Sequence, residues 1–166
     1  MRTPYILVLV LLTSCGFHLR GVADMPPEFA EMRVVDAGDA SDIIYDLSQA
    51  LQERGINVTD TAAMTMRIRG ESFSKRVLSV DSSGQATEYE LIYKVWFGLL
   101  GTEGRVWVPD ELVSIQRDLQ FDAQAVLGSS SEESLLQDEM RRDAIQQIIR
   151  RLEFTKEPIK DSVKSE

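Results

Sequence analysis

Few residues of the 166-residue chain could do covalent or metal chemistry, because it contains one cysteine, Cys15, and one histidine, His18. One thiol cannot form a disulfide within the chain or a thiolate zinc cluster, and a catalytic zinc normally binds two or three imidazoles. A Ser-His-Asp triad would depend on His18, which lies three positions after Cys15 in a segment with no rigid scaffold around it. These counts exclude disulfide-stapled folds and argue against zinc enzymes and triad hydrolases.

The acidic pairs at positions 132–133 and 138–139 are the remaining candidates for hydrolytic or metal-binding chemistry. The alternative interpretation is a solvated helix face, on which acids near the N-terminus interact favourably with the helix dipole and Asp138 pairs with Arg142. We favour this second interpretation because it does not require the acids to converge. The expectation is therefore a protein that is not an enzyme, with no metal site and no cofactor.

The chain is acidic, with 18 Lys and Arg residues against 27 Asp and Glu residues, a net charge of −9 and a pI near 4.7. Nucleic-acid binding is driven by basic side chains that neutralise phosphates, so we expect no nucleic-acid partner. The composition, 43% hydrophobic and 27% charged, is that of a folded globular protein. The length suits one domain with a short extension.

The N-terminus has the layout of a secretory signal, in which basic Arg2 precedes eight apolar residues at 5–12 and small residues follow. A transmembrane helix needs roughly 20 apolar residues, so this run is too short to be a stable span. The sequence Leu12-Thr13-Ser14-Cys15 resembles the bacterial lipobox. It predicts a lipoprotein signal peptide at 1–14, cleavage before Cys15, and S-diacylglyceryl and N-acyl lipid on that cysteine. The alternatives are an ordinary signal peptide with a chance cysteine, or a buried N-terminal helix.

The lipid on Cys15 would be a stable anchor, because each buried acyl CH₂ contributes about 0.8 kcal/mol and two or three chains would be attached. Gly16 follows the cysteine, at the position where lipoproteins retained in the inner membrane often have aspartate. We therefore expect a lipoprotein of the outer membrane, anchored on its periplasmic side.

The rest of the chain divides into a tether, one domain and a tail. Residues 15–31 include the Pro26-Pro27 pair, which disfavours helix, and are predicted to form a lipidated tether. Residues 32–155 contain the periodic apolar segments and are predicted to form a single α+β domain. The charged segment 156–166, which includes Pro158, is predicted to be a mobile tail.

Two segments of this domain have apolar residues at helical spacing. The first, at 40–54, has one apolar stripe and is followed by Gly55, a residue favoured just after a helix end. The second begins at Ser129–Ser131, whose hydroxyl groups suit a helix start, and continues to about Leu152. Its apolar residues recur every four positions, at Leu136, Met140, Ala144, Ile148 and Leu152.

Alternating apolar and polar residues predict three strands between these helices, joined as an antiparallel meander. The first begins near Met64 and ends at a hairpin turn, Asp81–Gly84. The second spans 88–99. The third begins at Arg105 and is interrupted by Pro109-Asp110.

With a short additional strand at 32–35, the element order is β-α-β-β-β-α. This order predicts an α+β two-layer sandwich, because two amphipathic helices must cover one apolar sheet face. The two helices would pack on one face of a mostly antiparallel four-stranded sheet, against the side that carries Tyr89 and Phe97.

The opposite face of the sheet is predicted to carry cationic side chains and one tryptophan, namely Arg67 and Arg69, Lys75 and Arg76 if the register allows, and Lys94 with Trp96. One interpretation is an ordinary charged exterior. The other is a contact surface with cationic groups for a polyanion and an aromatic anchor for a protein partner.

Two motifs resemble a known family. The run Cys15-Gly16-Phe17-His18-Leu19-Arg20-Gly21 is similar to the mature N-terminus of the LPS-assembly lipoprotein family, LptE. The segment Gly84-Gln85-Ala86-Thr87-Glu88-Tyr89 resembles the family's Gly-Gln-x-x-Glu-Tyr exit from a hairpin into its long central strand. The element order and the length also agree with this family, so the resemblance covers essentially the whole chain.

The resemblance implies a non-enzymatic subunit of lipopolysaccharide transport and assembly. Members of the family plug the lumen of the LPS-assembly barrel, LptD, as a 1:1 heterodimer that delivers LPS to the outer leaflet. They also help the barrel to fold and are reported to bind LPS. A compact domain with polar outer faces suits the polar interior of such a barrel.

One departure from the family changes the expected contacts. Some members have a basic residue in the turn before the Gln-x-x-Glu-Tyr segment, where it is thought to meet LPS, but this turn is Asp81–Ser83 here. The turn at 128–131 is also uncharged. Contacts with LPS or with the barrel are therefore expected from other residues: Lys75, Arg76, Lys94, Trp96 and Arg105.

Two other functions remain open at the level of sequence. A stand-alone outer-membrane lipoprotein that binds a periplasmic ligand or an envelope component predicts a concave apolar pocket. A lipoprotein enzyme that uses carboxylates predicts two acids that converge in a cleft.

Overall fold

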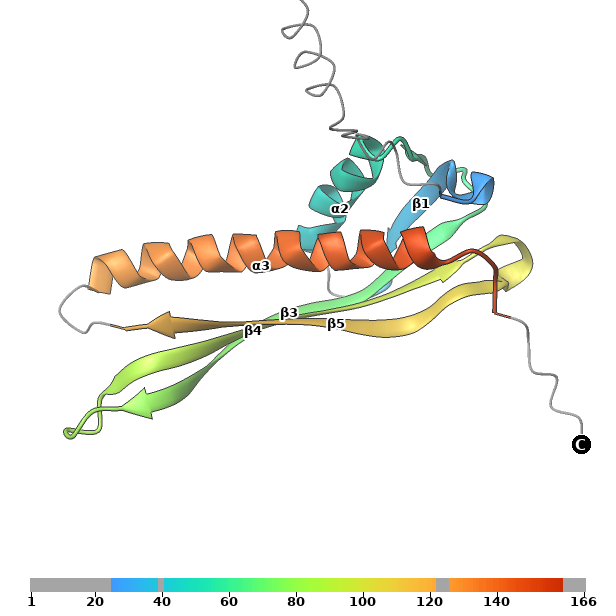
Figure 1. Ribbon diagram of the computed structural model, residues 1–166. Coiled ribbons are helices and arrows are strands. Elements are labelled where there is room, and N and C mark those ends of the chain that lie inside the picture. Colours follow the sequence, from blue (N-terminus) through green and yellow to red (C-terminus); the bar gives the residue numbers. More distant parts are fainter. Residues whose placement is uncertain (1–24, 39–40, 122–125, 160–166) are drawn as a thin grey trace, which may run out of the picture.

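The computed structural model describes residues 25–38, 41–121 and 126–159 (Figure 1). Its elements, in chain order, are the short 3₁₀ helix η1 (Pro27–Phe29), strand β1 (Glu31–Asp36), helix α2 (Ser41–Glu53), strands β2 (Asn57–Val58), β3 (Thr65–Val80) and β4 (Ala86–Leu100), the 3₁₀ turn η2 (Thr102–Gly104), strand β5 (Val106–Gln120) and helix α3 (Val126–Phe154).

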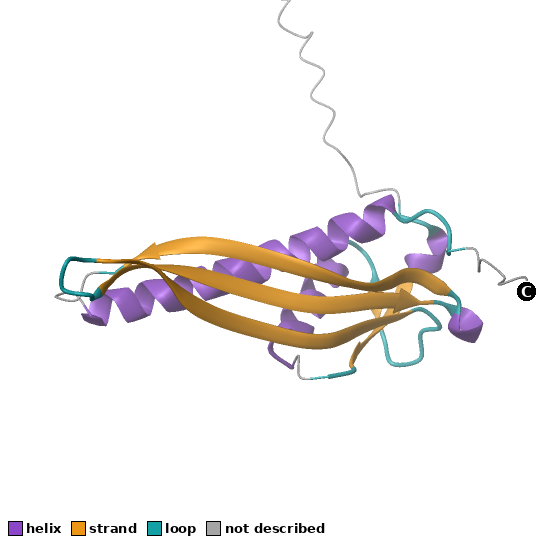
Figure 2. Cartoon of the chain, turned by 90° about the horizontal axis from the view of Figure 1, so that it is seen from below, coloured by secondary structure: helices purple, strands orange, loops and turns teal. Residues whose placement is uncertain are grey.

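The strands form one sheet in the order β2-β1-β3-β4-β5, with β3, β4 and β5 antiparallel and β1 parallel to both of its neighbours. Both helices cover the same face, which Figure 2 shows behind the three long strands. This confirms the predicted α+β sandwich, with five strands instead of four. The additional strand is β2, whose two residues are too few to show an alternating pattern.

Strand β5 continues through Pro109, where we expected an interruption. Its pairing with β4 shifts by one residue between Leu99↔Val108 and Phe97↔Glu111, which is the signature of a β-bulge. Proline is tolerated at bulges and on edge strands, and β5 is an edge strand. The bulge therefore accommodates the proline without ending the strand.

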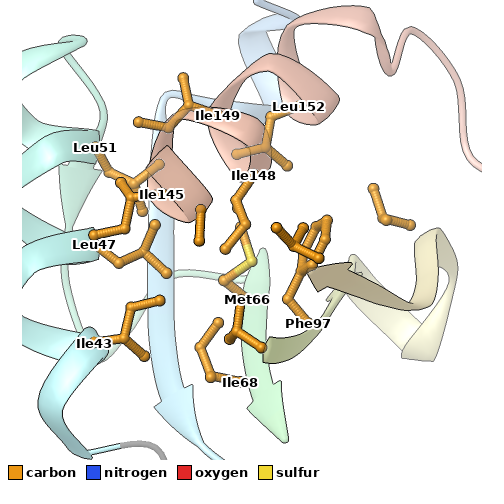
Figure 3. Close-up of a cluster of buried hydrophobic side chains, with 14 of the residues drawn as sticks. Ile43, Leu47, Leu51, Met66, Ile68, Phe97, Ile145, Ile148, Ile149 and Leu152 are labelled. Atoms are coloured by element: carbon orange, nitrogen blue, oxygen red, sulfur yellow. The ribbon is translucent and has the colours of Figure 1, made fainter. Parts of the chain in front are cut away.

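The core lies between the helices and the sheet. Figure 3 shows Leu47 and Leu51 of α2 facing Ile145 and Ile148 of α3, above Met66 and other side chains of the sheet. These residues are at most 3% exposed, as are the inward residues of the central strand β4: Leu91, Tyr93, Val95 and Phe97. The inward face of β4 is the face that alternation predicted.

The packed part of the chain begins before residue 32. Phe29, which the sequence placed in the tether, is fully buried, and its ring meets that of Trp107 edge-on at a centroid distance of 5.1 Å. At the other end, the backbone N–H of Ile159 donates to the carbonyl of Val106 (2.8 Å). The predicted signal peptide, Cys15 and most of the predicted tail lie outside the described residues.

The helix ends follow local sequence signals only in part. Gly55 lies two residues after the last residue of α2 and has a φ of +83°, as expected of the residue just beyond a helix end. Helix α3 begins at Val126 instead of at Ser129–Ser131. The residue directly before Val126 in the sequence is alanine, a poor N-cap, so the capping pattern could not indicate this start.

Candidate functional site

The face of the sheet turned away from α2 and α3 is covered by no described helix and could receive a partner (Figure 2). Along β4, the residues Ile92, Lys94 and Trp96 lie on this face, because their neighbours Leu91, Tyr93 and Val95 are buried under the helices. The strand register places Trp96 opposite Gly70 of β3 on one side and opposite Leu112 of β5 on the other. We call this surface the uncovered face.

Trp96 and Leu112 form an exposed apolar pair in the centre of the uncovered face. They lie opposite each other in register and are 47% and 40% exposed. Gly70, on the other side of Trp96, has no side chain that could cover the indole ring. Large aromatic side chains that are exposed in a monomer are typical anchors of protein interfaces.

Lys94 lies beside this pair and is exposed, with Ser72 and Ser114 as its cross-strand neighbours. Among the residues that the structure describes, no carboxylate lies within ion-pair distance of Lys94. The lysine is therefore available to a partner.

A clamp of two arginines around one aspartate borders the apolar pair. Arg67 Nη2 and Arg69 Nη1 donate to the two carboxylate oxygens of Asp110, at 3.0 and 2.5 Å. Gly98 makes room for this carboxylate, because a Cβ at position 98 would lie 2.5 Å from Asp110 Oδ1. The clamp ties β3 to β5 across the uncovered face.

The other candidate cations occupy three different environments. Arg76 lies on the uncovered face and pairs with Glu90 (2.6 Å), which raises the pKa of the arginine through the hydrogen bond and the opposite charge. Arg105 is exposed directly after η2. Lys75 lies on the helix-covered face, where its Nζ contacts Glu133 of α3 (2.5 Å) and lies 4.3 Å from the centre of the Tyr89 ring.

The expectation that Lys75 shares the uncovered face is therefore wrong. The pairing of β3 with β4 shifts between Ile68 and Gly70, so that Arg69 is an extra residue in the strand. A bulge reverses which positions point outward beyond it. Odd positions face outward before the bulge, at Arg67, and even positions face outward after it.

The surface residues predicted from the sequence did not include Leu112. Ser114, Gln116 and Asp118 alternate with inward residues of β5 and point outward. Leu112 lies two residues before Ser114, so the same alternation points it outward as well. The assumed interruption at Pro109-Asp110 concealed this continuation.

A buried polar cluster on the helix side is the strongest candidate for a catalytic site. Glu71 of β3 accepts hydrogen bonds from Tyr93 Oη (2.7 Å), Arg141 Nε (3.0 Å) and the backbone N–H of Ile43 in the first turn of α2 (3.1 Å). A hollow of about 270 Å³ adjoins the cluster and also has Asp42 on its wall.

The contacts of Glu71 indicate a structural role. Its side chain is 11% exposed and that of Arg141 is 14% exposed. The carboxylate neutralises a mostly buried guanidinium and satisfies a helix N-terminal N–H that has no partner in its own helix. The cluster thus joins β3, β4, α2 and α3, and the Glu71 carboxylate at its centre is engaged by all three of these elements besides its own.

The described part of the chain contains neither a cluster of metal-binding side chains nor a membrane-spanning helix. Within those residues, no three His, Cys, Asp or Glu side chains come together in a way that could hold a metal ion. None of the described helices combines the length and the apolarity that crossing a membrane requires.

The Tyr93 phenol predicts a loss of stability at alkaline pH. Burial, together with the hydrogen bond to Glu71, raises the pKa of Tyr93 far above its usual value of about 10. Above that pH the unfolded chain releases the phenol proton and the folded chain keeps it, so stability falls as pH rises. We expect the free energy of unfolding to fall by about 1.4 kcal/mol per pH unit above pH ~10.

Urea denaturation at intervals between pH 9 and pH 11 measures this slope. The Tyr93→Phe variant is the control, because it lacks the phenol and keeps the ring. Equal slopes in the two proteins would contradict the assignment of the alkaline loss to Tyr93.

The chain is similar to proteins of lipopolysaccharide assembly. Residues 29–152 match the family model LptE, described as Lipopolysaccharide-assembly. The LPS-assembly lipoprotein LptE of Yersinia pestis (strain Pestoides F) is 26% identical over 155 residues, which cover 88% of this chain and 72% of the relative.

Solved structures share the fold. The solution NMR structure of a lipoprotein B from Nitrosomonas europaea has a TM-score of 0.69 and 28% identity, over 81% of this chain and 88% of that one. The crystal structure of the rare lipoprotein B from Shewanella oneidensis has a TM-score of 0.65 and 25% identity, over 74% and 92%. The chain therefore belongs to the LptE family and is a non-enzymatic lipoprotein of lipopolysaccharide assembly.

Proposed function

We propose that this lipoprotein plugs the lumen of an LptD-like LPS-assembly β-barrel in the outer membrane, as one subunit of a 1:1 heterodimer. The barrel would be held in a state that passes LPS to the outer leaflet, and its folding would be assisted by the plug. The uncovered face is the observation that carries this proposal. It is a long sheet surface whose exposed apolar centre, Trp96 and Leu112, lies among polar and charged groups.

The chemistry of the uncovered face suits a barrel wall. The interior of an outer-membrane barrel is polar, and Arg69 (51% exposed), Lys94 and Ser114 can form hydrogen bonds with it. Trp96 supplies an aromatic anchor of the kind that carries much of the binding energy at interfaces. The face can therefore bind a polar wall around one apolar contact.

A lipid anchor at Cys15 would place the plug at the periplasmic mouth of the barrel. The lipid would lie in the inner leaflet of the outer membrane, with the domain joined to it by the segment that ends at η1. LPS would be contacted by cations that retain exposed surface. Lys94 and Arg105 fit this description better than Lys75, which is engaged by Glu133.

Trp96→Ala is expected to weaken capture of the barrel at least tenfold, because truncation of a central aromatic anchor commonly costs 2 kcal/mol or more. The measurement is an affinity pull-down of the tagged lipoprotein from detergent-solubilised outer membranes, with the co-purified barrel identified and quantified by mass spectrometry.

Tyr45→Ala is the matched control, because Tyr45 is an exposed aromatic residue (74%) of α2, on the helix side of the molecule. It is expected to change capture by less than twofold. Equal losses in both variants would show that the uncovered face is not the main contact. Recovery of the wild-type lipoprotein without any barrel would contradict the plug itself and favour a stand-alone lipoprotein.

A further inference from the structure

A second surface feature lies at the β1 end of the uncovered face and shares Arg67 with the arginine clamp. It is a hollow of about 700 Å³ between β1, the start of β3 and the β4–β5 turn. Its walls include the apolar side chains of Val35, Ala63 and Leu100, and two arginines, Arg33 and Arg67, lie along it. We call this feature the arginine hollow.

Positive charge in the arginine hollow is only partly compensated. Arg33 donates from Nη2 to Thr65 Oγ1 (3.1 Å) and forms no ion pair with any described residue. Arg67 shares the single carboxylate of Asp110 with Arg69. Asp110 and Arg69 lie beside the hollow and not on its lining, where the one carboxylate is that of Glu103, an exposed residue of η2. Three guanidinium groups therefore lie near two carboxylates.

Two nitrogen atoms of these arginines have no hydrogen-bond partner. The Nε atoms of Arg33 and Arg67 are both buried and unpaired. A buried N–H that is left without a partner lowers stability, and a partly buried cation without a counter-ion does so more strongly. A small shift of either arginine toward a bound anion would give its Nε–H an acceptor and its positive charge a counter-ion.

The lining selects the kind of anion. Guanidinium groups recognise phosphate through two parallel hydrogen bonds, which suits a phosphodiester between Arg33 and Arg67. The apolar side chains of Val35, Ala63 and Leu100 favour an anion that also carries a nonpolar body. Inorganic phosphate lacks such a body, whereas an anionic phospholipid combines both parts.

The arginine hollow also lies at the end of the fold where the chain arrives from the predicted anchor. Figure 1 shows β1 and the β4–β5 turn at this end and the β3–β4 hairpin at the opposite end. Cys15 precedes Met25, which packs against the core, by ten residues. An extended segment of that length spans at most about 35 Å, so the lipid headgroups around the anchor lie near this end.

We propose that the arginine hollow binds the headgroup phosphate of an anionic phospholipid from the leaflet that holds the anchor. This proposal rests on the lipid anchor at Cys15 that belongs to the proposed function. The bound phospholipid would fix the orientation of the domain relative to the membrane surface, which a flexible segment and one covalent lipid cannot do.

The test uses the full lipidated protein, purified in a nonionic detergent and titrated with dihexanoyl phosphatidylglycerol. Native mass spectrometry counts the bound lipids. We expect one saturable site, with dihexanoyl phosphatidylcholine binding at least tenfold more weakly because its choline cation would face the arginines. Arg33→Gln should weaken phosphatidylglycerol binding about tenfold, the loss expected when one charge-assisted hydrogen bond is removed.

Two further variants separate the site from general charge and from folding. Arg150→Gln removes one positive charge at an exposed position of α3 and should change the affinity by less than twofold. Ala63→Glu adds a carboxylate to the wall of the hollow and should block phosphatidylglycerol without removing a native contact. Melting temperatures show whether each variant is folded. If Arg33→Gln does not fold, binding of phosphatidylglycerol by Ala63→Glu tests the site instead.

Three results would overturn the proposal. One is equal binding of phosphatidylglycerol by the Arg33→Gln, Ala63→Glu and wild-type proteins. Another is an affinity of the wild-type protein for inorganic phosphate equal to its affinity for phosphatidylglycerol, which would make the hollow a simple anion site. A third is loss of barrel capture by folded Arg33→Gln with lipid binding unchanged, which would make it a protein contact. Intact barrel capture with reduced lipid binding is the expected result, and it separates this site from the plug interface.

Discussion

Replacement of Glu71 by alanine is expected to lower the free energy of unfolding by about 3 kcal/mol, because removal of one partner from a mostly buried ion pair costs roughly 3–5 kcal/mol. Three groups lose their acceptor at once: the Tyr93 hydroxyl, the Arg141 guanidinium and the Ile43 backbone N–H. Asp42 and Asp138 lie 3.7 and 3.6 Å from Arg141 and moderate the loss. Urea denaturation monitored by circular dichroism measures the change.

Glu139→Ala removes an exposed acid of α3 and is the matched control, with an expected change within about 0.5 kcal/mol. Glu71→Gln should fall between wild type and Glu71→Ala, because an amide can still accept from Tyr93 but carries no charge for Arg141. If Glu71→Ala were as stable as Glu139→Ala, the cluster would not hold the helices on the sheet.

The elements with one strongly periodic buried face could be predicted from sequence. Helix α2 runs from Ser41 to Glu53 where the pattern indicated 40–54, and β4 runs from Ala86 to Leu100 where it indicated 88–99. A single buried face imposes one period on each element, and this period can be recognised without knowledge of the neighbours. The two-layer arrangement then follows, because the apolar faces must meet.

Irregular pairing could not be predicted in the same way. The bulge at Arg69 and the bulge in β5 depend on how three strands fit side by side, and each changes which residues of its strand lie on the uncovered face. This is why Trp96 and Lys94, on the bulge-free middle of β4, were placed correctly, whereas Lys75, beyond the first bulge, was not.

The Glu71 cluster has no sequence signature. Glu71 and Arg141 are 70 positions apart, and neither residue type nor local spacing distinguishes them from solvated charges. The arginine hollow is similar, because Arg33 and Arg67 become neighbours only through the parallel pairing of β1 with β3. Sites assembled from distant strands require the topology before they can be recognised.

Replacement of Cys15 by alanine is expected to abolish acylation and to release the protein from membranes that lack the barrel. A single myristoyl chain binds a bilayer only marginally, with an association constant of about 10⁴ M⁻¹, so stable anchoring depends on two or more chains. Most of the large apolar side chains in the described part of the domain are buried in its core. The measurements are the fraction that sediments with membranes and the mass of the N-terminal peptide.

The design must separate the lipid from the signal peptide, because an uncut alanine variant would retain the apolar residues 5–12. A second variant therefore joins Cys15→Ala to a secretory signal that is cut by the ordinary signal peptidase, and this variant should be entirely soluble. Gly16→Asp is the control that keeps the lipid, and it should move the protein to the inner membrane without releasing it. Sedimentation of the correctly processed alanine variant, in cells without the barrel, would show that the domain binds membranes by other means. Release of that variant together with retention of Gly16→Asp would assign stable membrane anchoring to the acyl chains on Cys15.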